Sequence, residues 1–190
     1  MRRRFLAVIP LIIPMLLGAQ QQLPSAPNGV ARTFLSFGPP YGGWLLLAFD
    51  SIPASQYGFR PTAAQQSIGY IAQHLESANY ALCSRFGRQR HVMSAKDSLA
   101  DTIKAQWPKD TLIARVRASL VFCRDEIEQL TDAQLADEFI ISTPSGPQTV
   151  LRVRDLMLLI TDLAEHYSQL SSYMRLLGLV PPSAQARPRQ

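Results

Sequence analysis

Hydrophobic residues recur every three or four positions in four long stretches of the chain, which is the period of one face of an α-helix. The pattern predicts helices over residues 30–49, from Ala63 or Ser67 to Arg85, over 109–130 and over 150–177. Each stretch pairs an apolar stripe with a polar face, so each must bury its stripe against another element. Four such helices around one core predict an all-α protein, with a four-helix bundle as the architecture.

Proline and glycine mark the breaks in this pattern. The run Gly38-Pro-Pro-Tyr-Gly-Gly43 predicts an interruption or bend in the first helix, because proline lacks a backbone donor and glycine is a poor helix former. A short helix is expected within residues 94–107. Residues 137–148 are expected to hold a short extended piece with a turn at Pro-Ser-Gly-Pro, and we find no convincing strand pattern.

The N-terminus has the pattern of a secretory signal peptide. Three arginines at positions 2–4 precede a short apolar run over residues 5–17, and small residues end at Ala19. The run is short for a membrane-spanning helix and contains two prolines, which favours a cleaved leader over the alternative of an uncleaved anchor. We therefore predict a periplasmic or secreted protein, cleaved near Ala19, with no stable membrane insertion afterwards.

The remaining domain organisation follows from composition. Residues 1–19 are predicted to be the signal peptide and residues 20–28 a polar linker containing proline. The helical domain is predicted over residues 29–182, and residues 183–190 are predicted to be a disordered tail.

The charge balance gives little support to a nucleic-acid partner. The chain carries 19 basic and 14 acidic residues, a formal charge of +5, but three of the arginines lie in the predicted leader. The remaining excess is about +2, and the basic residues near positions 85–96 are expected at a helix end and in a loop, as a solvated face. We expect no nucleic-acid partner.

The two cysteines, Cys83 and Cys123, leave two alternatives open. An exported protein meets an oxidising compartment, which favours a disulfide. Sequence does not show how far apart the two Cα atoms lie, so two buried apolar thiols are the other alternative. Their spacing matches no zinc motif.

Candidate chemistry centres on His166, near the middle of the last predicted helix. Asp162 stands four residues earlier and so lies on the same helix face, while His74 lies in the middle of the second helix. Imidazole and carboxylate groups bind zinc, nickel, manganese or iron, and helical bundles build such sites from facing helices. A metal site at His74, Asp162 and His166 is one interpretation. The other is two histidines of the core or its rim, with a simple Asp–His hydrogen bond.

Two segments resemble the DinB-like superfamily of DNA-damage-inducible proteins. Residues 59–83, ending in His74-Leu-Glu-Ser-Ala-Asn-Tyr-Ala-Leu-Cys83, are similar to its second-helix signature, and residues 165–182 are similar to its fourth-helix signature. The resemblance implies a bundle of up-down-down-up topology. It also implies a divalent metal held by one histidine of the second helix and a His-x3-His pair of the fourth. His74 and His166 match two of these ligands, whereas position 162, where the family has histidine, holds Asp162.

The function predicted from this resemblance is that of an exported protein with a divalent-metal site, acting on a small molecule. Members of the family include thiol-dependent transferases and isomerases, so a thiol-dependent transferase is one candidate activity. Metal-dependent hydrolysis is the other, and export favours it because low-molecular-weight thiols are chiefly cytosolic. The alternative is a non-catalytic binding protein that has lost the metal. The resemblance further implies a homodimer.

Overall fold

The computed structural model describes residues 28–185. The predicted signal peptide, nearly all of the predicted linker and residues 186–190 lie outside the described residues. None of the helices within the described part is long and apolar enough to cross a membrane.

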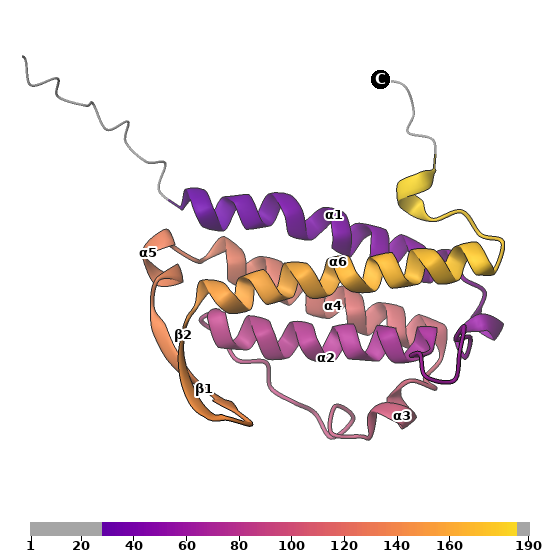
Figure 1. Cartoon of the computed structure of the whole chain (residues 1–190), viewed down its shortest axis with the longest axis horizontal. Coiled ribbons are helices and arrows are strands. Elements are labelled where there is room, and N and C mark those ends of the chain that lie inside the picture. The colour runs from indigo at the N-terminus through magenta and orange to yellow at the C-terminus, as the bar shows by residue number, and fades with distance from the viewer. Residues whose placement is uncertain (1–27, 186–190) are drawn as a thin grey trace, which may run out of the picture.

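Four long helices lie side by side and form most of the molecule (Figure 1). They are α1 (Gly29–Ser51), α2 (Ile68–Phe86), α4 (Lys109–Glu128) and α6 (Val153–Leu176). α2 packs against α4 and α6, and α1 packs against the same two helices. In Figure 1, α1 and α6 run away from the end that carries the strands, while α2 and α4 run toward it. The prediction of a mostly helical protein is confirmed.

Short elements connect and extend these helices. The helical ones are η1 (Ala54–Gln56), α3 (Asp101–Lys104), α5 (Asp132–Leu135) and η2 (Pro182–Ala184). The expected short helix within residues 94–107 is therefore the single turn α3. η2 crosses from the predicted domain into the segment predicted to be a disordered tail, and there the Ser183 backbone N–H donates to the Tyr167 hydroxyl at 2.8 Å. Regular structure thus continues past the predicted boundary at residue 182.

The core lies between the four helices and takes side chains from each of them. Its fully buried large side chains include Leu45, Phe49, Leu75, Leu112, Leu156 and Tyr173. Burying one such side chain stabilises the fold by about 1.5–3 kcal/mol. Burial of the apolar helix faces is therefore the main contribution that fixes the positions of α2 and α6.

The helix α1 continues through the Gly-Pro-rich run, so the interruption expected there does not occur. Packing explains why these poor helix formers are tolerated. A Cβ atom at Gly42 would lie 3.1 Å from the Leu120 side chain, and one at Gly38 would lie 3.3 Å from Ile160. The glycines let α1 approach α4 and α6 closely, and this tertiary contact overrides the local propensity.

Two strands follow α5, contrary to the expectation of no strand. β1 (Glu138–Thr143) and β2 (Gly146–Leu151) pair antiparallel, from Glu138 opposite Leu151 to Thr143 opposite Gly146. The turn falls within the predicted Pro-Ser-Gly-Pro run, where Gly146 takes a positive φ of 106°. The hairpin is largely exposed, with Ile140 at 71% exposure, so no buried face imposed a hydrophobic alternation on the sequence.

A disulfide joins Cys83 of α2 to Cys123 of α4, which decides between the two alternatives for the cysteines. The two Cα atoms are 5.2 Å apart, within the usual range for a disulfide. Both residues are buried, so the bond lies inside the core.

Candidate metal centre

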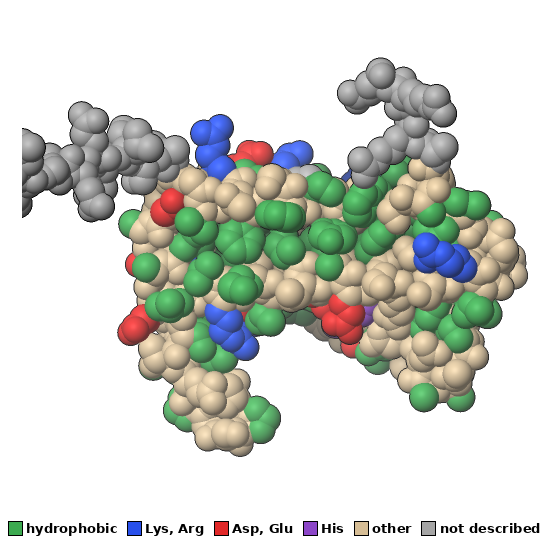
Figure 2. All heavy atoms as spheres, turned by 45° about the horizontal axis from the view of Figure 1, so that its top comes forward, with side chains coloured by type: hydrophobic (Ala, Val, Ile, Leu, Met, Phe, Trp, Pro, Cys, Tyr) green, Lys and Arg blue, Asp and Glu red, His purple; other side chains and the backbone are tan. Residues whose placement is uncertain are grey.

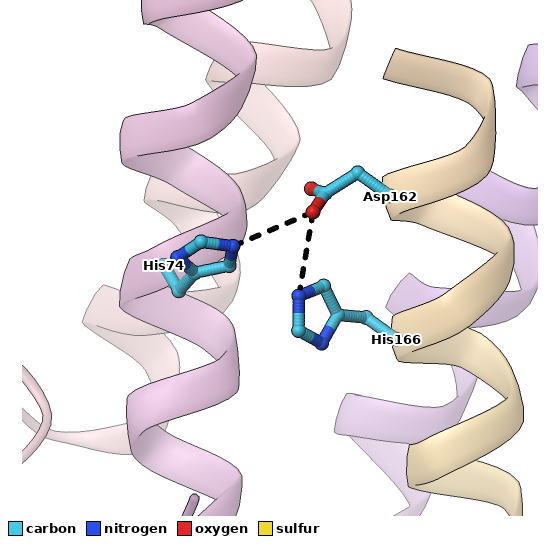
Figure 3. A group of neighbouring side chains, drawn as sticks. All are labelled: His74, Asp162 and His166. Carbon is cyan, nitrogen blue, oxygen red and sulfur yellow. Dashed lines mark hydrogen bonds and ion pairs between the residues drawn. The ribbon is translucent and has the colours of Figure 1, made fainter. Parts of the chain in front are cut away.

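The three predicted ligands meet between α2 and α6 (Figure 3). His74 extends from α2, and Asp162 and His166 extend from successive turns of α6. One carboxylate oxygen of Asp162, Oδ1, lies 3.5 Å from Nε2 of His74 and 3.5 Å from Nε2 of His166. The two imidazole rings meet edge to face with their centroids 4.8 Å apart. The structure therefore brings together all three residues that the sequence singled out.

One side of the site is buried in the protein, and the other side is open to solvent. The His166 side chain is 8% exposed, that of Asp162 23% and that of His74 36%. A groove of about 810 Å³ opens over the site, and its other walls come from residues before α2 and from α6. Glu165 is exposed and lines this groove. A small molecule in the groove would reach the three ligands directly.

The charges of the site stabilise one another. Burial raises the pKa of Asp162, but hydrogen bonds and positive charge from His166 and His74 outweigh burial and hold that pKa well below its usual range. Burial lowers the pKa of His166, but the hydrogen bond and negative charge of Asp162 outweigh it, so the pKa of His166 is raised. The carboxylate is therefore ionised at neutral pH and draws positive charge toward itself.

The arrangement fits a divalent metal in its chemistry and, for two of its three pairs of ligand atoms, in its spacing. Ligand atoms bound at about 2.0–2.2 Å in a tetrahedral shell lie roughly 3.3–3.6 Å apart. The carboxylate oxygen meets that spacing to both rings. All three ligand atoms lie within 4.8 Å of one another, a wider limit than that spacing, so the match holds for the two oxygen–nitrogen pairs. The second carboxylate oxygen of Asp162 is buried without a hydrogen-bond partner, so the carboxylate has unused capacity. Aspartate in place of histidine at position 162 thus preserves a usable set of ligand atoms.

Residues behind the ligands were missed by the sequence reasoning. Gln169 accepts a hydrogen bond from Nδ1 of His166 at 3.0 Å, and its amide nitrogen donates to the hydroxyl of Tyr173 at 3.0 Å. The available signal was spacing, because Gln169 stands three residues after His166 and Tyr173 four residues after Gln169. That spacing occurs throughout any helix, and it does not show which pairs face inward.

Comparison with models of protein families shows which superfamily the chain belongs to. Residues 45–170 match the model of the DinB superfamily, which is more than half of the chain. The chain belongs to the DinB superfamily. No curated protein matches the chain in sequence.

Solved structures share the DinB fold at low sequence identity. A DinB-like protein from Bacillus cereus ATCC 10987 superposes with a TM-score of 0.62 at 17% identity, covering 80% of this chain and 95% of that one. A DinB-like protein from Bacillus subtilis gives a TM-score of 0.60 at 16% identity, covering 82% of this chain and 99% of that one. At these identities the likeness shows the fold alone.

The mycothiol-dependent maleylpyruvate isomerase is also similar in fold to this DinB protein. Its TM-score is 0.57 at 12% identity, and the match covers 74% of this chain and 59% of that one. The isomerase therefore contains a large part that has no counterpart in this comparison.

Proposed function

We propose that this DinB protein binds one divalent metal ion through His74, Asp162 and His166. The supporting observation is the single carboxylate oxygen placed 3.5 Å from a nitrogen of each imidazole ring, at the floor of an open groove. When bound, such a metal acts as a Lewis acid that makes a nucleophile from water or a thiol at neutral pH. Zinc, nickel, manganese and iron all accept this set of ligands. The proposal includes the four-helix bundle of up-down-down-up topology, supported by the directions of the long helices in Figure 1.

The activity that we propose is metal-assisted hydrolysis of a small molecule. The groove walls offer an acid, Glu165, together with glutamine amides and a serine, and no Lys or Arg is among the residues that line it. Neutral or positively charged polar substrates suit these walls better than strongly anionic ones. The buried His166 and the partly buried Asp162 hold the ligand geometry, while the more exposed His74 lies on the side from which a substrate arrives.

Thiol-dependent transfer is the second candidate, favoured by the fold likeness to the mycothiol-dependent isomerase. The disulfide between Cys83 and Cys123 argues for hydrolysis instead. Disulfides persist in oxidising compartments, whereas low-molecular-weight thiol cofactors are chiefly cytosolic. Turnover of a panel of esters and amides by the metal-loaded protein, with and without added thiol, separates the two candidates.

We also propose export, with residues 1–19 removed as a signal peptide, to the periplasm or the medium. The disulfide supports this proposal. Mass spectrometry of the protein from an exporting bacterial host is expected to find a chain that begins near Gln20. An intact N-terminus would overturn the proposal.

A homodimer is the oligomeric state that we propose. Figure 2 shows a band of hydrophobic side chains across α1 and α6. Phe37 and Met157 are more than half exposed, and Tyr41 and Trp44 pack against Tyr167 across the α1–α6 contact. Exposed apolar bands of this kind mark interaction surfaces. Light scattering after size exclusion is expected to give twice the chain mass, and Phe37→Glu is expected to give a monomer.

The metal proposal is tested by metal content. The protein is purified without a histidine tag, loaded with zinc, nickel or manganese, desalted and analysed for metals. One metal per chain is expected, and His166→Ala is expected to lose it. The matched control is His91→Ala, which removes a histidine that is outside the cluster. Absence of metal from the loaded wild-type protein would overturn the proposal and favour the non-catalytic binding protein.

A further inference from the structure

A chain of hydrogen bonds runs from His166 into the protein, on the side of the ring away from Asp162. Nδ1 of His166 contacts the amide oxygen of Gln169 at 3.0 Å, and the amide nitrogen of Gln169 contacts the Tyr173 hydroxyl at 3.0 Å. The hydroxyl contacts the backbone carbonyl oxygen of Gln66, just before α2, at 3.1 Å. Tyr173 is 1% exposed, so water does not compete for its hydroxyl.

The last acceptor fixes the direction of every bond in this chain. A carbonyl oxygen only accepts, so the single hydroxyl proton of Tyr173 goes to Gln66. The hydroxyl oxygen is then left to accept from the NH₂ group of Gln169, which turns the amide oxygen toward His166. An amide oxygen also only accepts, and therefore Nδ1 of His166 must carry a proton.

We propose that Gln169 and Tyr173 are positioning residues that hold His166 with its proton on Nδ1 and its Nε2 lone pair toward Asp162. The inference rests on the proposed metal function and deepens it. In a neutral ring with Nδ1 protonated, Nε2 and the Asp162 carboxylate are two hydrogen-bond acceptors 3.5 Å apart, and a cation between them would satisfy both. Histidines that bind metals ordinarily donate their other N–H to such an outer partner. The chain disfavours the competing arrangement, in which a neutral His166 satisfies Asp162 with its own Nε2–H.

The tautomer of His166 tests the chain without any metal. Nitrogen-15 NMR of the metal-free protein, at a pH where the ring is neutral, is expected to show Nδ1 protonated. Tyr173→Phe removes the hydroxyl, frees the Gln169 amide to rotate and is expected to raise the fraction with Nε2 protonated. The matched control is Tyr167→Phe, another buried tyrosine of α6, whose hydroxyl bonds to Ser183 instead. A wild-type ring protonated on Nε2, or an unchanged tautomer in Tyr173→Phe, would overturn the inference.

Zinc affinity, measured by competition with a chelating dye, gives a second readout. Gln169→Leu removes the acceptor for Nδ1–H and is expected to weaken zinc binding by roughly tenfold or more, as for other outer partners of metal ligands. Gln169→Glu keeps an acceptor at the same place and is expected to restore wild-type affinity or exceed it. Equal loss in both variants would assign Gln169 a packing role and overturn the inference. If wild-type protein binds no zinc while the tautomer shifts as expected, the metal proposal fails and the positioning chain stands.

Discussion

Reduction of the disulfide between Cys83 and Cys123 is expected to destabilise the protein by about 4 kcal/mol. The bond closes a loop with a sequence separation of 40 residues. In the chain-entropy model, a crosslink of that span lowers the conformational entropy of the unfolded chain by an amount equivalent to about 4 kcal/mol at room temperature. Because the free energy of unfolding of a single domain is only about 5–15 kcal/mol, the disulfide accounts for a large share of it.

Urea unfolding followed by circular dichroism, with and without a phosphine reductant, measures this difference. With a urea dependence of about 2 kcal/mol per molar, the midpoint is expected to fall by about 2 M on reduction. The control is the double variant Cys83→Ala/Cys123→Ala, whose midpoint should not respond to the reductant. If mass spectrometry shows two free thiols while the midpoint moves by less than about 0.5 M, the entropy reasoning is refuted.

The remaining predictions concern single side chains and pH. Asp162→Asn removes the charge at the site and is expected to lower zinc affinity by at least tenfold, whereas Asp162→His, which gives the family pattern, is expected to keep it; calorimetric titration measures both. Without metal, Asp162 stabilises the fold above its unfolded pKa near 4 and loses this effect as pH falls through its lowered folded pKa. His166 stabilises the fold below its unfolded pKa near 6.5 and loses this effect as pH rises through its raised folded pKa. The urea midpoint in a chelator should therefore peak between about pH 4 and 6.5, and the peak should flatten in Asp162→Asn. Asp155→Ala removes a fully buried carboxylate paired with the half-exposed Arg85 at 2.5 Å and is expected to cost about 3 kcal/mol in urea unfolding. Glu126→Ala leaves two backbone N–H groups after α2 without their acceptor, and a loss of about 1–3 kcal/mol is expected in the same assay.

The helices were predictable from sequence because each carries its own periodic signal. The stripe that includes Ile71, Leu75 and Leu82 is buried as expected, and its helix ends at Phe86, one residue beyond the prediction. The interruption predicted in the first helix was wrong because tertiary contacts outweigh local preference there, whereas the hairpin was missed because it has no buried face. At Gly42 the missing side chain lets α1 pack closely against Leu120 of α4, 3.1 Å from where a Cβ atom would lie, and a sequence alone does not show that neighbour.

The sequence predicted which residues meet at the site, but it did not predict their hydrogen bonds. The i, i+4 spacing places Asp162 and His166 on one face of α6, and His74, in the middle of another predicted helix, was singled out from the sequence and matched by the resemblance. The hydrogen bond from His166 to Gln169 depends on the rotation of an amide, and the bond from Tyr173 to Gln66 depends on the packing of the segment before α2 against α6. These features arise from the assembled fold, and they determine where the proton of His166 lies.

The helix α2 is the one that both the disulfide and the proposed metal site would link to a neighbouring helix, α4 and α6 respectively. The disulfide joins it to α4 at Cys83, and the metal site would join it to α6 at His74, nine residues away or about 13.5 Å along the axis. Local opening of α2 would have to break a covalent bond or a coordination shell, depending on which end moves. In the oxidised, metal-loaded protein its backbone amides should therefore exchange with deuterium only through global unfolding. α1, which approaches its neighbours through glycines and side-chain packing, should exchange earlier.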